Sequence, residues 1–300
     1  MDDSGGFGAP PPPPPPSAGG GGQLPQRDFG DVFSTAFNVY KAHFAQLLKI
    51  VALIVVPLTL LNALIANVVF APKKETVLIL GQEVTGAAVR STGASYFVLV
   101  FGVLIGAIIG YFLQAVVLRA GALAAIGDNP DIDESMRYGL KRFGSVWWIA
   151  ILVALVAVSV ILLGALLAFG IAGLGLFVIV VGVVWAIYAS TMLSMSVPSL
   201  IVEDQRGTGA LSRSWNLVQG HFWHALGIIL VAGIIASIIG GIIGAIGGSN
   251  WFLSWVFGAI GQIIVAPFVA LVTIVLYLDL RARTESLTGD TLRQELSRTA

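Results

Sequence analysis

Long apolar runs without charged residues constrain the fold of this chain more than any other feature. A helix needs about 20 predominantly apolar residues to cross the hydrocarbon layer of a bilayer. Runs of this length lie at residues 50–70, 95–118, 146–169, 174–197, 225–244 and 252–278. They predict an all-α fold, a polytopic membrane bundle of six transmembrane helices.

The composition excludes several other classes of protein. Hydrophobic residues make up 57% of the chain and charged residues 11%, whereas about 25% of the residues of a soluble protein are charged. Basic and acidic residues balance at 16 each, so no basic surface favours a nucleic acid partner. The chain has no cysteine, which excludes disulfides, thiol nucleophiles, thiolate metal ligands and cysteine-linked lipid anchors.

Residues 1–26 differ from the rest of the chain because they are rich in proline and glycine. A segment of this composition cannot bury a core, and we expect it to be disordered. The proline run predicts a polyproline II rod, in which Pro10, Pro13 and Pro16 would contact an aromatic groove of a cytoplasmic protein. The alternative is a solvated tail with no dedicated receptor.

The basic residues predict the orientation in the membrane. Six crossings place both termini on one side, and the loops on the other side hold only Lys73, Lys74 and Arg90 of the 16 basic residues. Basic residues favour the cytoplasmic side of a membrane. We therefore expect both termini to be cytoplasmic. The membrane domain covers residues 27–284, and residues 285–300 form a polar tail, either a short helix or a frayed end.

A short amphipathic stretch precedes each pair of predicted spans. The first and third stretches carry four residues at the same helical spacing, 178 positions apart: Phe33, Phe37, Tyr40 and Phe44, then Leu211, Trp215, Val218 and Phe222. This spacing puts each set on one helix face. The middle stretch fits less well, with Ile132, Met136, Gly139 and Phe143.

These stretches predict three parallel repeats, at residues 28–118, 131–202 and 207–280, related by a pseudo-threefold axis along the membrane normal. Each repeat would be an interfacial helix followed by two spans. The interfacial helices would lie on the cytoplasmic surface with their apolar faces toward the lipid. The alternative is that they are soluble loop helices packed against the bundle.

Small residues recur at intervals of four in the spans. The ladders are Gly102, Gly106 and Gly110; Gly240, Gly244 and Gly248; and Gly233, Ser237 and Gly241. They favour close packing between helices of the same bundle, and a dimer face is the alternative. Pro57 and Pro267 lie inside spans and predict kinks, which would either line a cavity or accommodate packing.

Ionisable side chains are absent from the predicted spans. Ion-coupled transporters keep such a group at membrane depth, so the sequence argues against a proton or sodium pump. It permits the passage of an apolar or lipid-like molecule. Apart from hydroxyl groups, the polar side chains inside the spans are those of Asn62, Asn67, Gln114 and Gln262.

Four residues offer the ingredients of a site at the membrane surface. His221 and His224 are three apart, and Glu203 and Asp204 precede them. They would form a metal site or a paired-carboxylate site, but interfacial histidines beside a solvated acidic turn are the simpler interpretation. Because HExxH, GxSxG and Walker motifs are absent from the sequence, we expect no catalytic residue, metal or cofactor.

Asp279 and Arg281 close the last span. We expect them to form ion pairs, with Arg119 or Glu203 at the equivalent ends of the other repeats as partners.

A set of residues in the last third carries a family resemblance. They are Pro198, Glu203, Asp204, Ser214, Trp215, Gly220, Pro267, Phe268, Tyr277, Asp279 and Arg281. Together they resemble the membrane domain found beside glycerophosphoryl diester phosphodiesterases, and the stand-alone bacterial membrane proteins related to it. The proline- and glycine-rich tail resembles those of actinobacterial members. The resemblance covers residues 28–284 and implies the cytoplasmic membrane of a bacterium. The phosphodiesterase itself is a separate soluble barrel, which this chain lacks, so its activity is not carried over.

These observations favour a non-enzymatic scaffold or accessory subunit, in contact with membrane lipids and with a cytoplasmic partner for its tail. The alternative is a carrier or flippase-like protein for lipids or amphipathic molecules. A weaker alternative is an interfacial enzyme that uses Glu203, Asp204, His221 and His224.

Overall fold

The computed structural model describes residues 24–69, 73–79, 82–88, 110–124, 127, 131–168, 172–248, 250–285 and 287–299. Within these residues, five helices are long and apolar enough to cross a membrane. These spans correspond to α2 (Phe44–Val69), α4 (Ile132–Ala168), α5 (Ala172–Met192), α8 (Phe222–Ile246) and α9 (Trp251–Glu285). The chain is therefore a multi-pass membrane protein built as a helical bundle, as predicted.

The remaining predicted span, at residues 95–118, is described in part. A shorter apolar helix covers Gly110–Ala124, while residues 95–109 lie outside the described part of the chain, together with Gly102, Gly106 and residues 1–23. Pro10, Pro13 and Pro16, the residues predicted to contact a partner, lie within residues 1–23.

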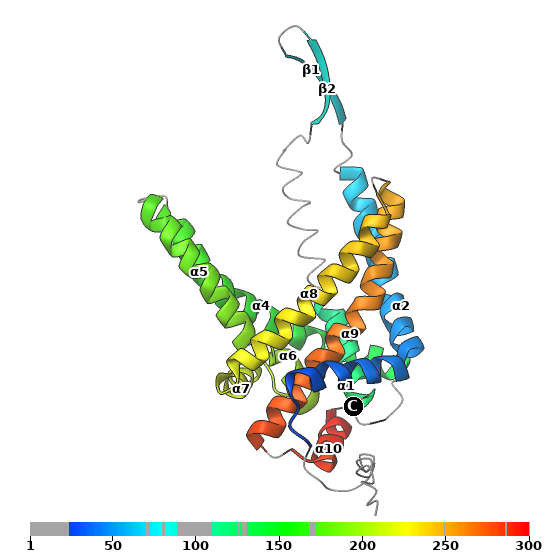
Figure 1. The fold of residues 1–300 in the computed structure, drawn as a ribbon, viewed down its shortest axis with the longest axis vertical. Helices are drawn as coiled ribbons and strands as arrows, with labels where there is room; N and C mark the ends of the chain where they lie inside the picture. The colour runs from blue at the N-terminus through cyan, green and yellow to red at the C-terminus, as the bar shows by residue number, and fades with distance from the viewer. Residues whose placement is uncertain are drawn as a thin grey trace, which may run out of the picture.

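The helices that hold the first span of each predicted repeat, α2, α4 and α8, all leave from the same end of the bundle (Figure 1), although α4 diverges from α8. Helices α5 and α9 return antiparallel to α4 and α8. Four shorter helices gather at the end from which α2, α4 and α8 start: α1 (Phe29–Ala42), α6 (Ser196–Glu203), α7 (Thr208–Gln219) and α10 (Gly289–Thr299). We call these four helices the platform.

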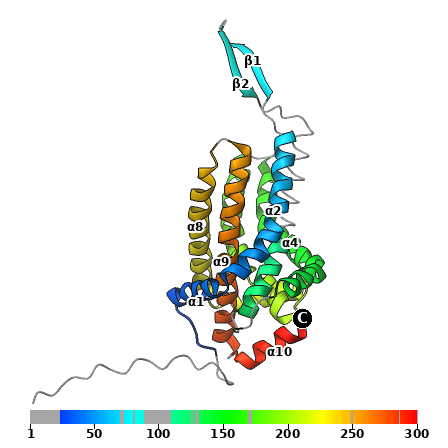
Figure 2. The same ribbon diagram turned by 90° about the vertical axis from the view of Figure 1, so that its right-hand side faces the viewer.

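A β-hairpin stands at the opposite end of the bundle (Figure 2). Its strands are β1 (Lys73–Ile79) and β2 (Gln82–Ala88), antiparallel with Ile79 paired to Gln82. The all-α prediction therefore holds for the membrane bundle but not for the loop between the first two spans. Threonine and valine residues favour strands there, and two residues suffice to connect strands in a hairpin.

Two of the three amphipathic stretches are separate helices. The chain breaks between α1 and α2 at His43 and between α7 and α8 at Gly220 and His221, so His43 and His221 occupy equivalent positions in the predicted repeats. In the middle repeat, α4 instead runs without interruption from the amphipathic stretch into the span. Figure 2 shows α1 lying across the lower end of the bundle rather than along it.

Helix α9 is the centre of the bundle and packs against α1, α2 and α8. In the most apolar stretch of α9, 61% of the residues are buried, compared with 11% in α8 and 17% in α4. The buried part is its platform end, from Ala270 to Ala282. Helices α4 and α5 pack chiefly on each other, and in Figure 1 this hairpin leans away from α8 and α9.

Glycines set several close helix contacts, but the sequence ladders do not identify them. A Cβ at Gly261 of α9, outside the ladders, would lie 3.5 Å from the Gly240 Cα of α8, an ordinary van der Waals contact. A Cβ at any of the described ladder glycines would itself meet open space: Gly110, Gly233, Gly240, Gly241, Gly244 and Gly248. A close seam joins α4 to α5, where a Cβ at Gly164 would lie 2.8 Å from the Ile179 nitrogen and one at Gly182 would lie 2.9 Å from the Ile161 nitrogen.

Candidate functional site

Glu203, at the end of α6, is the centre of an ion-pair network in the platform. Its Oε2 accepts a hydrogen bond from Arg213 Nε (2.8 Å), and its Oε1 lies 3.2 Å from Arg281 Nε. The Tyr277 hydroxyl also donates to this carboxylate. The Glu203 side chain is only 11% exposed, so the expectation of a solvated acidic turn is wrong for this residue.

Glu285 and Glu295 complete the network. Arg213 Nη2 donates to Glu285 (2.6 Å), and Arg281 forms a bidentate pair with Glu295 (2.6 and 3.1 Å) and a contact with Glu285 (3.2 Å). The predicted ion pair between Arg281 and Glu203 is confirmed. The network joins α6, α7, α9 and α10. It comprises Glu203, Arg213, Tyr277, Arg281, Glu285 and Glu295, and we call it the platform network.

Asp279 holds a second cluster, beside the first on α9. Its side chain is fully buried, and Oδ2 accepts a hydrogen bond from Arg283 Nε (2.8 Å) and lies 3.1 Å from His224 Nε2. Its Oδ1 accepts the backbone N–H of Arg27 (2.6 Å), and Arg283 donates to the Arg27 carbonyl. The backbone N–H of Leu24 donates to the Leu287 carbonyl (2.8 Å). The arm that precedes α1 is thus fixed to the end of α9.

His221 lies close to this second cluster. Burial lowers the pKa of His221, the positive charges of Arg283 and His224 lower it further, and Asp279 opposes them. Within the described residues, no hydrogen bond or ion pair joins His221 or His224 to Glu203 or Asp204. The described part of the chain also contains no group of three His, Asp or Glu residues placed to hold a metal ion.

Asp204 forms the turn between α6 and α7 in the left-handed conformation, with φ of 55°, which aspartate tolerates better than most residues. Its carboxylate pairs with Arg142 of α4 (2.7 Å) and with Arg206 (3.2 Å). Burial raises the pKa of Asp204, but the hydrogen bonds and charges of Arg206 and Arg142 outweigh it, so the net pKa is lowered. Glu203 and Asp204 are adjacent in sequence but bind different partners.

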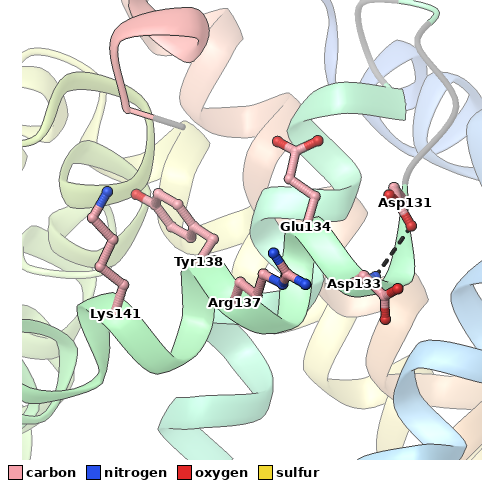
Figure 3. A pocket seen from close by; sticks show the side chains of 6 residues that line it. All are labelled: Asp131, Asp133, Glu134, Arg137, Tyr138 and Lys141. Atoms are coloured by element: carbon pink, nitrogen blue, oxygen red, sulfur yellow. Dashed lines mark hydrogen bonds between the residues drawn. The ribbon is translucent and has the colours of Figure 1, made fainter.

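A hollow of about 450 Å³ opens where α4 begins, and Figure 3 shows the side chains that line it: Asp131, Asp133, Glu134, Arg137, Tyr138 and Lys141. Glu134 pairs with Arg119 of the helix Gly110–Ala124 (3.2 Å), and that guanidinium lies over the Tyr138 ring. Arg119 therefore pairs with Glu134, and among the described residues no ion pair joins it to Asp279, its expected acidic partner. Both signs of charge line the hollow, so it favours no single class of ligand.

The predicted interfacial face of α1 is divided between the bundle and the outside. Phe33 packs against the core and Tyr40 is buried, whereas Phe37 and Phe44 are 50% and 44% exposed. The Tyr40 hydroxyl donates to the Ile264 carbonyl of α9 (3.0 Å). Outward-facing aromatic rings are typical of a helix at the headgroup boundary.

In the third repeat the corresponding residues turn inward. The Trp215 and Phe222 rings lie 5.8 and 5.1 Å from the Tyr188 ring of α5. Val218 is buried, and Leu211 packs against the core.

In the middle repeat, Met136 packs against the core and Phe143 contacts Phe112 edge-on at 5.9 Å. A Cβ at Gly139 would lie 2.4 Å from a Val116 methyl, so glycine allows α4 to approach the helix Gly110–Ala124. The Ile132 side chain lies outside the described residues.

The other motif residues found in the sequence support the same end of the bundle. Ser214 is fully buried, donates to the Met192 carbonyl (2.7 Å) and accepts the Met195 N–H (3.0 Å), which fixes the turn between α5 and α6. Pro198 is buried in α6, and Gly220 ends α7.

Pro267 is buried in α9, and its neighbour Phe268 contacts the Tyr40 ring edge-on at 6.2 Å. Both roles predicted for this proline have support, because α1 docks beside it and its neighbour Ala266 lines a cavity.

A cavity of about 340 Å³ lies at membrane depth between α9 and the helix Gly110–Ala124. It brings together Gln114 and Gln262, two of the polar residues that the sequence places inside spans. Thr273 adds a hydroxyl group. Among the described residues that line the cavity, none is charged.

Sequence reasoning missed most partners of the platform network. Arg213, Glu285 and Glu295 belong to three helices, and no local pattern shows that they meet. The spacing of Arg281 and Glu285, four apart on one helix face, is a signal that could have found one pair.

The chain has no match among protein-family models, curated proteins or solved structures.

Proposed function

We propose that the chain is a non-enzymatic protein of a bacterial cytoplasmic membrane that acts as a scaffold or accessory subunit. The observation that carries this proposal is the platform network, which ties α6, α7, α9 and α10 together. Its charged groups bind one another, so they stabilise a surface instead of being free to act on a substrate. The pairing of His224 with Asp279 likewise weighs against the interfacial enzyme.

The platform would face the cytoplasm, because most basic residues belong to this end of the bundle. The arm from Leu24 is fixed to α9, and Pro16 precedes Leu24 by eight residues. Eight residues span at most about 29 Å. A partner bound to the proline run would therefore be held close to the platform surface.

The test is purification of the native protein in mild detergent from its own cells, followed by mass spectrometry of bound proteins. A stoichiometric partner should accompany the full chain and be lost when Pro10, Pro13 and Pro16 are replaced by serine. The control is a chain that keeps the prolines but has three exposed platform residues changed to serine. It shows whether any three surface substitutions are enough to lose the partner. Recovery of the same proteins with both forms of the tail would remove the tail from the proposal, and recovery of none would contradict the scaffold role.

We also propose kinship with the membrane domain found beside glycerophosphoryl diester phosphodiesterases. What supports it is that Glu203, Tyr277 and Arg281, three of the residues that carry the resemblance, belong to one network. A motif with a shared structural role is less easily produced by chance than scattered identities. The comparison of this chain with an experimentally solved member of that family would test the proposal.

A second candidate function is a carrier for lipids or amphipathic molecules, and the cavity between α9 and the helix Gly110–Ala124 favours it. The test is reconstitution into vesicles with a fluorescent phospholipid and a quencher added outside. A carrier should expose the probe of both leaflets to the quencher, whereas protection of the inner leaflet would contradict this function.

A further inference from the structure

Two helix faces line the cavity at membrane depth, which is open on its outer side. On α9 the lining residues recur at the spacing of one face from Gln262 to Thr273, and on the facing helix from Gly110 to Val117. At 1.5 Å per residue, the stretch on α9 is about 17 Å long. The volume of about 340 Å³ lies within the range of small-molecule sites, which is about 300–1,000 Å³.

Two of the three polar side chains that line this cavity have no hydrogen-bond partner among the described residues. Within the part of the chain that the structure describes, neither the Gln114 amide nor the Gln262 amide has a hydrogen bond. The Thr273 hydroxyl donates to the Val269 carbonyl of its own helix (2.8 Å), which leaves its oxygen able to accept. An unpaired amide in hydrocarbon is unfavourable, and polar residues inside a membrane commonly mark binding sites.

The rest of the lining is apolar, with glycine, leucine and valine on the helix Gly110–Ala124 and valine and alanine on α9. Since the described lining has no charged residue, a phosphate or ammonium group would be buried there without a counter-charge. Glutamine amides instead match hydroxyl, ester and amide groups, because each amide both donates and accepts.

We propose that the cavity binds an uncharged amphipathic molecule, with its hydroxyl or ester group at Gln114 and Gln262 and its hydrocarbon chain along the valine-lined face of α9. This site goes beyond the scaffold role. It also deepens the carrier proposal by naming the ligand class, although binding does not require transport.

The test is photocrosslinking of the full chain in vesicles that contain one of two diazirine-labelled lipids, a diacylglycerol or a phosphatidylcholine. The diacylglycerol should label the segment 262–273, and phosphatidylcholine should label it far less. The double variant Q114L/Q262L loses both amides. Two hydrogen bonds of ordinary strength correspond to about thirtyfold in affinity, so labelling at low probe concentration should fall about thirtyfold.

A second variant keeps the test decisive if the double variant does not fold. Ala266→Phe fills the cavity and should abolish labelling of the segment, while Ala245→Phe, at an exposed position on α8, is the matched control and should leave it unchanged. Equal labelling by the two lipids, or unchanged labelling in Ala266→Phe, would overturn the site.

Lipid movement measured in the same vesicles separates the two proposals. Diacylglycerol labelling without movement supports the site and contradicts the carrier. A different result would contradict the site but not the carrier proposal. In that case the lipid still moves in Ala266→Phe, and the segment 262–273 is not labelled in the wild type.

Discussion

Replacing Arg281 with methionine will destabilise the protein far more than replacing Glu203 with glutamine. The platform network sets two arginines, Arg213 and Arg281, against three glutamates, Glu203, Glu285 and Glu295. The R281M variant leaves one arginine facing three carboxylates. The E203Q variant leaves two charges of each sign, and its amide oxygen can still accept a hydrogen bond from Arg213.

The exposure of these side chains sets the size of the effect. Removal of one partner from a buried ion pair costs about 3–5 kcal/mol. Arg281 is 5% exposed, but Glu285 and Glu295 are 32% and 22% exposed, so water screens part of the repulsion between the carboxylates. We expect about 3 kcal/mol for R281M and about 1 kcal/mol, the contribution of one hydrogen bond, for E203Q.

The assay is thermal unfolding of the purified protein in mild detergent, followed by circular dichroism. With about 2–4 °C per kcal/mol for a chain of this size, Tm should fall by roughly 6–12 °C in R281M and roughly 2–4 °C in E203Q. The control R281K keeps the charge but not the bidentate contact with Glu295, and should lie between them. Equal shifts in R281M and E203Q would refute the reasoning, because the balance of charge would then not decide stability.

Three further outcomes are expected. Gly182→Ala should destabilise by about 1–3 kcal/mol through overpacking against α4, whereas Gly244→Ala, in open space, should change stability by less than about 1 kcal/mol; both are measured as above. Burial and nearby positive charge lower the pKa of His221, so protonation of this histidine favours the unfolded chain. The free energy of unfolding should therefore be constant above about pH 6.5 and fall below it. The variant H221Q should reduce the slope of that fall. A slope unchanged by H221Q would assign the pH dependence to other groups. In this cysteine-free chain, a cysteine at Gly86 should react with an impermeant maleimide added to intact cells, and one at Gln205 only after the membrane is opened; the reverse pattern would contradict a cytoplasmic platform.

The spans could be predicted from the sequence because the requirement for an apolar helix is local and strict. The run at 225–244 corresponds to α8 within three residues at each end. The joins between consecutive helices were harder to predict. The repeat pattern pairs His43 with His221, and both positions mark breaks, but the middle repeat has Arg142 there, inside a continuous α4. Arg142 pairs with Asp204, which lies between the second and third predicted repeats, and local spacing does not predict this contact.

The candidate sites follow the same division. The glutamines of the membrane cavity stand out in the sequence because amides are rare at that depth. Their meeting in one cavity, like the meeting of Glu203 with Arg213 and Arg281, depends on how α9 packs against its neighbours. The loop between the first two spans has only a weak strand pattern, so the sequence does not predict the hairpin formed by β1 and β2.

The central position of α9 has a consequence for synthesis. Because α9 follows the other described spans in the chain, those spans enter the bilayer before their common contact surface exists. Glu203 and Arg213 can already pair with each other at that stage, but Arg281 and α10 are still missing. A nascent chain that stops before Trp251 therefore lacks the element that closes the core and completes the platform network.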